Sequence, residues 1–248
     1  MVGYLAAYFT PEGANIFNTF HSRQGTREEA PQVAPTGARR LDTPLYIVNS
    51  GRTASACESF AYTLQAAQRA TIVGERSAGG ANPGASVPAG DGFSVFISFG
   101  SPINPITQRN WEGEGVIPTE ATSHADAVTR AHILALQTLA SSQTGDAQRE
   151  AQWALTALQA AGPTLSARQM REYAGDYGTR SIAIENGALV LHRDRRPALR
   201  LIPIERDLFA VDYAAPLQRV RFERDDRGRI EALPLSLVTG PEFRDLKQ

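Results

Sequence analysis

The sequence predicts an α/β fold followed by a small antiparallel β-rich domain. Residues 44–50 form an almost unbroken apolar run, residues 55–70 carry apolar side chains at helical spacing, and residues 71–75 form a second short apolar run. This order of strand, helix and strand indicates a β-α-β unit with a parallel strand pair. From about residue 165 the chain changes to short alternating runs joined by turn sequences, which predicts antiparallel strands.

Length and composition exclude several classes of protein. The chain has 248 residues, 42% of them apolar, and a net charge of −1, so it offers no broad basic field for nucleic acid. No run of about 18 apolar residues could span a bilayer, and the first ten residues lack the features of a signal peptide. The single cysteine, Cys57, cannot form an internal disulfide, and we expect it to be a small buried residue.

The remaining segments of the first half follow from their patterns. Residues 1–10 predict an amphipathic helix and residues 15–25 a strand, whereas the prolines and charges of residues 26–44 predict a surface segment. Further predicted segments are an irregular Gly/Pro-rich loop at 76–92, an alternating strand at 93–100, a turn-rich return at 101–122 and two helices within 124–161. The glycine-rich loop lacks the Gly-Lys-Ser ending of a phosphate-binding loop, so we expect no nucleotide, and neither another cofactor nor a metal.

Turn signals set the expected domain organisation. Asn186-Gly187 is the strongest hairpin signal of the chain, and Asp226-Arg227-Gly228 is a second turn signal in the same half. We expect residues 1–140 to form the first domain, residues 141–164 a helical connector, and residues 165–248 a small β-rich accessory domain.

Ser55 has two possible roles in its local sequence. With Glu58 three residues later it matches a capping box, in which the serine oxygen accepts an amide of the first turn and the glutamate returns to the serine amide. The same position is also suited to a nucleophile, because the positive potential of a helix N-terminus stabilises an oxyanion and the Ala56 amide can donate to it. Local spacing does not decide between the two.

An ordered series of motifs extends the second interpretation. It comprises a strand, Ser-x-x-Glu opening a helix, Arg-Ala-Thr-Ile-Val-Gly-Glu, Gly-Gly-Ala-x-Pro-Gly, Asp-Gly-Phe, Asn-Pro-Ile-Thr and Trp-Glu-Gly-x-Gly-Val-x-Pro. Over residues 44–120 this series resembles the catalytic core of the tail-specific, or C-terminal processing, serine peptidases. The similarity is greatest to their interphotoreceptor retinoid-binding protein-like and tricorn-like branch. The resemblance implies a ClpP/crotonase-like β-α core, present in part.

The resemblance also implies roles for individual residues. Ser55 takes the nucleophile position and Ala56 supplies an oxyanion-hole amide. The general-base lysine of the processing peptidases corresponds to Gly80, so a Ser-Lys dyad is excluded, while Glu112 corresponds to a glutamate that orients a histidine in the tricorn-like branch. The peptidase ancestry suggests an extended peptide ligand, and the glycines of the loop at Gly79, Gly80 and Ala81 would allow its close approach and expose amides for strand-like pairing.

No histidine of the sequence matches a general base. His21, His124 and His192 are each expected to be structural or surface residues. The family's Asp-Leu-Arg-x-Asn-x-Gly-Gly segment, which supplies a second oxyanion donor, would fall before Met1. We therefore expect the chain to hold the carboxyl part of a peptidase core.

The expected function is a serine-type peptidase acting on a peptide or protein, incomplete or weakly active as this chain. Two alternatives remain open. One is a non-catalytic relative that binds a hydrophobic ligand or peptide in a cleft near Phe93, Phe96 and Trp111, and the other is an inert remnant. Relatives act mostly outside the cytoplasm of bacteria, but the sequence carries no export signal and predicts neither localisation nor oligomeric state.

Overall fold

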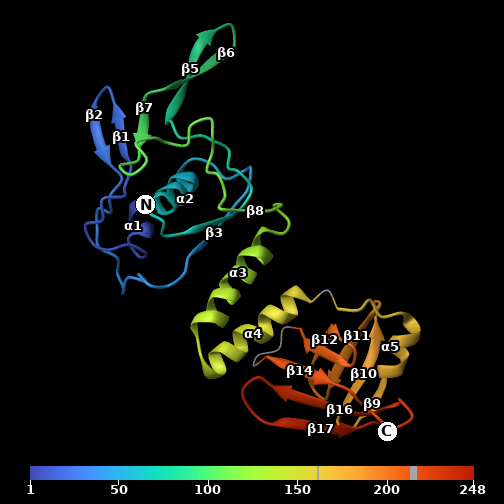
Figure 1. Ribbon diagram of the computed structural model, residues 1–248. Helices are drawn as coiled ribbons and strands as arrows, with labels where there is room; N and C mark the ends of the chain where they lie inside the picture. The colour runs from blue at the N-terminus through green and yellow to red at the C-terminus, as the bar shows by residue number, and fades with distance from the viewer. Residues whose placement is uncertain (161, 213–216) are drawn as a thin grey trace. The chain divides into compact units, whose positions relative to one another are not determined.

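The computed structural model describes residues 1–160, 162–212 and 217–248. It divides the chain into two compact units, Met1–Ala135 and Leu136–Gln248, which can be followed by colour in Figure 1. The predicted fold class is confirmed, since the first unit is a mixed α/β structure and the second is rich in antiparallel strands. The predicted domain boundaries remain a prediction.

A small parallel sheet positions the candidate site in the first unit. Strands β3 (Tyr46–Asn49) and β4 (Thr71–Gly74) are parallel and joined by helix α2 (Ala56–Ala66), and β8 (Glu120–Ala121) adds to β4 in parallel. The order β3-β4-β8 places three strand ends at one edge of the sheet. In α/β folds, loops at the carboxyl ends of parallel strands are where sites usually form.

The predicted apolar face of α2 is confirmed. Leu64 is fully buried, and Phe60 and Ala67 pack beside it against Ile16 and Phe17 from the amino-terminal segment. Their spacing of three and four residues places them on one side of the helix.

The almost unbroken apolar run of residues 44–50 predicts a buried strand, and this prediction is wrong for one face of β3. Val48 is 41% exposed, whereas Ile47 packs in the clusters beneath α2. The apolar run of β3 therefore has one packed face and one exposed face.

The other elements of the first unit are helix α1 (Val2–Ala6) and two antiparallel sheets. The strands β1 (Thr19–Ser22), β2 (Gly25–Glu28) and β7 (Gly100–Ile103) form one sheet, and β5 (Gly84–Gly90) pairs with β6 (Phe93–Ser98) in the other. The irregular loop expected at 76–92 is therefore wrong in its second part. Pairing with the alternating strand β6 overrides the weak strand propensity of glycine and proline in β5.

The second unit is built around an antiparallel sheet of nine strands within the described residues. The strands are β9 (Gly175–Tyr177), β10 (Arg180–Glu185), β11 (Ala188–Arg193), β12 (Arg196–Glu205), β13 (Leu208–Val211), β14 (Gln218–Arg221), β15 (Glu223–Arg224), β16 (Ile230–Leu237) and β17 (Glu242–Leu246). The hairpin predicted at Asn186-Gly187 is confirmed, because it joins β10 to β11 in a two-residue loop with φ of 49° and 77°. Two positive φ values in succession define the type I′ turn.

Among the described residues, three helices belong to this unit or lead to it. Helices α3 (Ala127–Ser142) and α4 (Gly145–Gln159) confirm the two predicted within 124–161, and the division between the units falls inside α3. Helix α5 (Ala167–Tyr173) was missed. Its capping box, Ser166 with Gln169, was the signal that could have revealed it.

Helix α4 packs on the second unit. Its Ala151 and Leu155 are buried, and the Arg149 guanidinium donates to the Val238 carbonyl at 3.0 Å. The Arg219 guanidinium lies 4.5 Å from the centre of the Trp153 ring, a cation–π contact. These contacts group α4 with the carboxyl-terminal sheet, although its residues were expected to form a connector.

We expect limited proteolysis with a low-specificity protease to release a carboxyl-terminal fragment that begins at or before Gly145, because packing protects α4. Amino-terminal sequencing and intact mass of the stable fragment measure this. A fragment beginning near Leu165 would show that α4 is a free connector, and early cutting within 80–120 without a stable fragment would contradict two units.

Candidate active site

Ser55 lies at the turn between the end of β3 and the start of α2. The preceding turn is closed by the Thr53 amide, which donates to the Ser50 carbonyl at 2.9 Å. Ser55 itself is exposed and has φ of 57° and ψ of −121°. An ordinary helix N-cap lies in the β region, so this backbone is not that of a simple capping serine. Strained conformations of this kind concentrate at functional sites and cost on the order of 1–3 kcal/mol.

Only one half of the predicted capping box is a firm hydrogen bond. The Ser55 amide donates to the Glu58 Oε2 atom at 2.8 Å. The Ser55 side chain faces the Glu58 amide in capping-box order but makes no capping hydrogen bond of ordinary geometry. The hydroxyl is thus little engaged in capping.

Glu58 is a fully buried carboxylate that joins Ser55 to the glycine-rich loop. Its Oε1 atom accepts the Ser77 hydroxyl at 2.6 Å and the Gly79 amide at 2.6 Å. Its Oε2 atom accepts the Gly80 amide at 3.0 Å in addition to the Ser55 amide. The capping-box pattern predicted only the last of these contacts, and neither the loop contacts nor the role of Ser77 was anticipated.

The electrostatics of Glu58 favour its charged form. Burial of the carboxyl opposes ionisation, but the hydrogen bonds that it accepts, led by that from Ser77, outweigh burial and lower its pKa below the ordinary value of 4.5. A buried carboxylate with four donors is satisfied, and removing its charge would leave several donors without an acceptor.

Glu112 holds the next two residues of the same loop. Its Oε2 atom accepts the Ala81 amide at 2.7 Å and the Asn82 amide at 2.8 Å. Among the described residues no histidine contacts this carboxylate, so orientation of a base by Glu112 remains a prediction. The observed contacts make Glu112 a positioning residue for the loop.

The amides of the predicted substrate-binding residues are already occupied. Those of Gly79 and Gly80 donate to Glu58 and that of Ala81 to Glu112, so they are not free to pair with a peptide. A substrate-binding role for these three residues remains a prediction, and a peptide would have to contact atoms other than these amides.

Glycine is required where the loop meets the segment around Trp111. The Gly113 amide donates to the Gly79 carbonyl at 2.9 Å, and Gly79 has φ of 84°. A Cβ atom on Gly79 would lie 3.1 Å from backbone atoms of Gly113 and Gly115. The Ser77 hydroxyl accepts the Val116 amide at 2.6 Å on the same side. The two segments thus fit together through backbone contacts that a side chain would push apart.

The oxyanion-hole role of Ala56 remains a prediction. Ala56 is the first residue of α2, where an amide has no intrahelical acceptor, and it is exposed. The expectation for Cys57 is wrong, because its side chain is exposed. It lies in the first turn of α2 and is not part of the buried cluster around Leu64.

Among the described residues, none of the four histidines is hydrogen-bonded to the Ser55 hydroxyl, and His132 lies in helix α3. His21 is in strand β1, and the His192 ring contacts Glu185 at 2.7 Å in the second unit. His124 follows β8, and its amide donates to the Glu75 carboxylate at 3.0 Å. None of them takes the position of a general base beside Ser55.

The cleft expected near Phe93, Phe96 and Trp111 is not formed. Trp111 is 2% exposed and packs with Tyr62 and Ala61 in a buried cluster that contains neither phenylalanine. Phe93 and Phe96 are exposed on the β5–β6 hairpin. Trp111 was expected to line a cleft, but it is a core residue that packs in one cluster with Ala81 of the glycine-rich loop.

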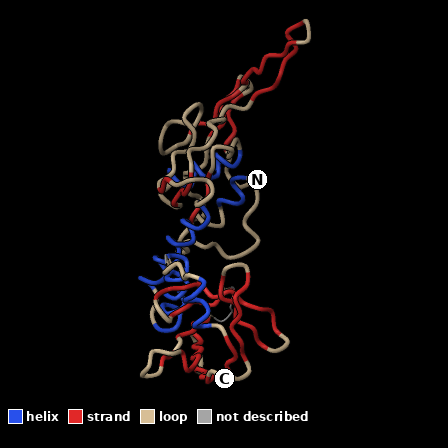
Figure 2. Tube along the Cα trace, turned by 90° about the vertical axis from the view of Figure 1, so that its right-hand side faces the viewer, coloured by secondary structure: helices blue, strands red, loops and turns tan. Residues whose placement is uncertain are grey.

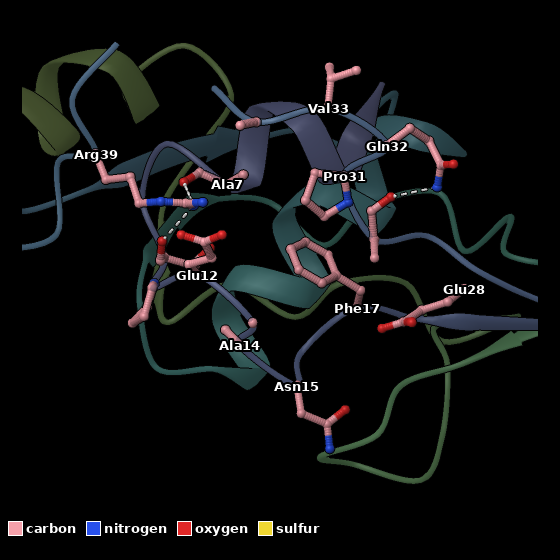
Figure 3. Close-up of a pocket in the computed structure, with 15 residues that line it drawn as sticks. Ala7, Glu12, Ala14, Asn15, Phe17, Glu28, Pro31, Gln32, Val33 and Arg39 are labelled. Atoms are coloured by element: carbon pink, nitrogen blue, oxygen red, sulfur yellow. Dashed lines mark hydrogen bonds between the residues drawn. The ribbon is translucent and has the colours of Figure 1, made fainter. Parts of the chain in front are cut away.

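A separate cavity of about 550 Å³ lies near the amino-terminal segment. Figure 3 shows Phe17 and Pro31 at one side of it and Glu12 and Arg39 at another. Arg39 donates to the Thr10 carbonyl at 3.0 Å. Neither Ser55 nor the loop that Glu58 holds lines this cavity.

Within the described residues, no group of histidine, cysteine, aspartate and glutamate side chains is arranged to hold a metal ion. No helix in the same residues has the length and apolar character needed to cross a membrane.

We expect Glu58→Gln to destabilise the first unit by about 3 kcal/mol or more, because it removes a buried charge and places an amide NH₂ group against buried donors. Glu114→Gln is the matched control, since Glu114 is an exposed glutamate nearby and accepts no hydrogen bond within the described residues. Urea unfolding followed by Trp111 fluorescence, in a Trp153→Phe background, measures the difference. Equal stabilities of the two variants would contradict the role of Glu58.

The pH dependence follows from the lowered pKa of Glu58. The stabilisation by the ionised Glu58 carboxylate is fully present above the pKa that this group has in the unfolded chain, near 4.5. It is lost as the pH falls through the lower pKa of Glu58 in the folded state. The stability difference between the Glu114→Gln and Glu58→Gln variants should therefore shrink on acidification below about pH 4.5. A difference that stays constant or grows would contradict an ionised, hydrogen-bonded Glu58.

Known proteins resemble part of the chain. Three solved structures are similar over part of the chain: a photosystem II D1 C-terminal processing protease (23% identity, TM-score 0.38, 54% of this chain and 34% of that one), a lipoprotein from Streptococcus agalactiae (16%, 0.41, 56% and 49%) and a putative S41 protease from Bacteroides fragilis (15%, 0.41, 52% and 35%). The chain thus spans less than half the length of each. Residues 4–122, which include Ser55, Glu58 and Glu112, match peptidase family S41. This region, slightly less than half of the chain, is thus similar to peptidase family S41.

Proposed function

We propose that the chain carries the nucleophile of a serine-type peptidase, with Ser55 attacking a peptide bond of a polypeptide substrate. The observation that supports this most is the backbone of Ser55, which has φ of 57° and ψ of −121° at an exposed strand-to-helix turn. A strained turn between a strand and a helix is a known way of presenting a serine hydroxyl for attack. A capping serine would need no such strain.

The proposed chemistry is acyl transfer in two steps. The Ser55 oxygen forms a bond to the carbonyl carbon, its proton passes through a base to the leaving amine, and the peptide C–N bond breaks. A water molecule then hydrolyses the ester and restores the hydroxyl. The Ala56 amide at the start of α2 supports the negative charge on the carbonyl oxygen, with the helix N-terminus adding to the favourable potential.

The rate that we propose for this chain is low. A general base typically contributes on the order of 100- to 10,000-fold, and no base contacts the Ser55 hydroxyl within the described residues. The finer proposal, that the site acts on carboxyl-terminal segments as a tail-specific peptidase, rests on the motif resemblance alone.

Position 80 offers a direct test of the missing base. A Cβ atom on Gly80 would have no neighbour closer than the Glu58 Oε2 atom at 3.8 Å, and its φ lies outside the left-handed region. A side chain can therefore be added there without strain. Lysine at this position would place an amine where the resemblance puts a general base.

We expect a fluorophosphonate probe to label Ser55 slowly, and Gly80→Lys to increase the labelling rate by on the order of 10-fold or more. Gly80→Met is the matched control, because it adds a similar chain without a base. Mass spectrometry locates the adduct, and Ser55→Ala in each background should abolish it. The proposal would be contradicted if Ser55 carried no adduct in either the wild-type chain or Gly80→Lys. Equal labelling rates for Gly80→Lys and Gly80→Met would also contradict it.

A further inference from the structure

The β5–β6 hairpin extends away from the remainder of the first unit. Every residue from 85 to 99 is exposed, and Figure 2 shows the two strands projecting from the rest of the unit. The buried clusters of this unit include no hairpin residue among those described. An isolated two-stranded hairpin is marginally stable in water and usually gains stability by packing on another element.

One face of this hairpin is apolar. The register pairs Ala85 with Ile97 and Val87 with Val95, so these side chains point to the same side. Phe93 lies on this side by alternation, and Phe99 continues it beyond the strand end. The large residues of this face have the following exposed fractions: Val87 44%, Phe93 73%, Val95 52%, Ile97 51% and Phe99 59%.

The opposite face has a different composition. Ser94 and Ser98 alternate with Phe96, and the Phe96 ring lies over Gly84, where an added Cβ atom would come within 2.4 Å of it. Phe96 is 63% exposed, but it is the one large apolar side chain among the described residues of the opposite face. The larger apolar surface is therefore on the Val95 face.

The hairpin carries almost no charge. Between Pro83 and Gly100 the only ionisable side chain is Asp91, which lies in the turn at the tip. A partner of another kind would ordinarily be recognised in part through charged or hydrogen-bonding groups, and this face has none to offer. A second copy of the same face meets no like-charge repulsion, because an isologous contact brings identical surfaces together.

The area is sufficient for such a contact. With side chains of these sizes, each copy would bury roughly 500 Å², so a pair would bury on the order of 1,000 Å². That is about the lower limit for a specific protein–protein interface. The contact is therefore in the range of a weak dimer.

We propose that the apolar face of the β5–β6 hairpin is a self-association surface, on which a second copy of this chain packs face to face about a twofold axis. The proposal is independent of the chemistry assigned to Ser55.

The test compares substitutions on the two faces of one strand. Sedimentation equilibrium of the full chain, from about 1 µM to 1 mM, should show a monomer–dimer equilibrium. Val95→Glu buries a charge in the contact and should weaken dimerisation on the order of 100-fold. Ser94→Glu, on the opposite face of the same strand, should leave it nearly unchanged. Circular dichroism checks that both variants remain folded.

A cross-linking experiment gives a second readout. In a Cys57→Ala background, Val95→Cys should form a disulfide-linked dimer on oxidation, whereas Ser94→Cys should not. A wild-type chain that is monomeric throughout the concentration range would overturn the proposal. So would equal effects of Val95→Glu and Ser94→Glu, or open-ended growth, which would indicate association through the strand edges.

Discussion

The carboxylate of Glu58 is the acceptor that the Ser55 turn and the glycine-rich loop have in common. It is fully buried and receives one hydroxyl and three amides, from the start of its own helix and from a loop about twenty residues later. Because the energy of a buried charge depends on all of its donors, the turn, the helix and the loop are coupled through one group. Glu112 extends this support to the next two amides of the loop.

This coupling explains how the chain maintains an unfavourable backbone at Ser55. A serine with φ of 57° and ψ of −121° persists only where its surroundings determine it, and the bond from its amide to Glu58 is one such restraint. The strain leaves the hydroxyl exposed and weakly engaged at a helix N-terminus, with the Ala56 amide beside it. These are the features on which the proposed acyl transfer depends, while the supply of a base is the feature that limits its rate.

Sequence reasoning was most successful where a local rule fixes the structure. The β-α-β unit, the buried face of α2 and the Asn186-Gly187 turn follow from periodicity and turn chemistry. It failed where the outcome depends on distant partners. The exposure of Cys57 and the burial of Trp111 are set by tertiary packing. The Ser-x-x-Glu spacing fits both a cap and a strained nucleophile turn, because the difference is a backbone angle that no residue type at this position encodes.

The central claim is that Glu58 and its neighbours hold Ser55 in a strained, left-handed backbone conformation. It is tested most directly by comparing the free energies of unfolding of the wild-type chain and Ser55→Gly. Glycine adopts a positive φ without strain, so we expect the glycine variant to be more stable than the wild type by about 1 kcal/mol. At an ordinary capping serine the same substitution destabilises the protein by roughly a few tenths of a kcal/mol. A glycine variant less stable than the wild type, or only equally stable, would contradict the account.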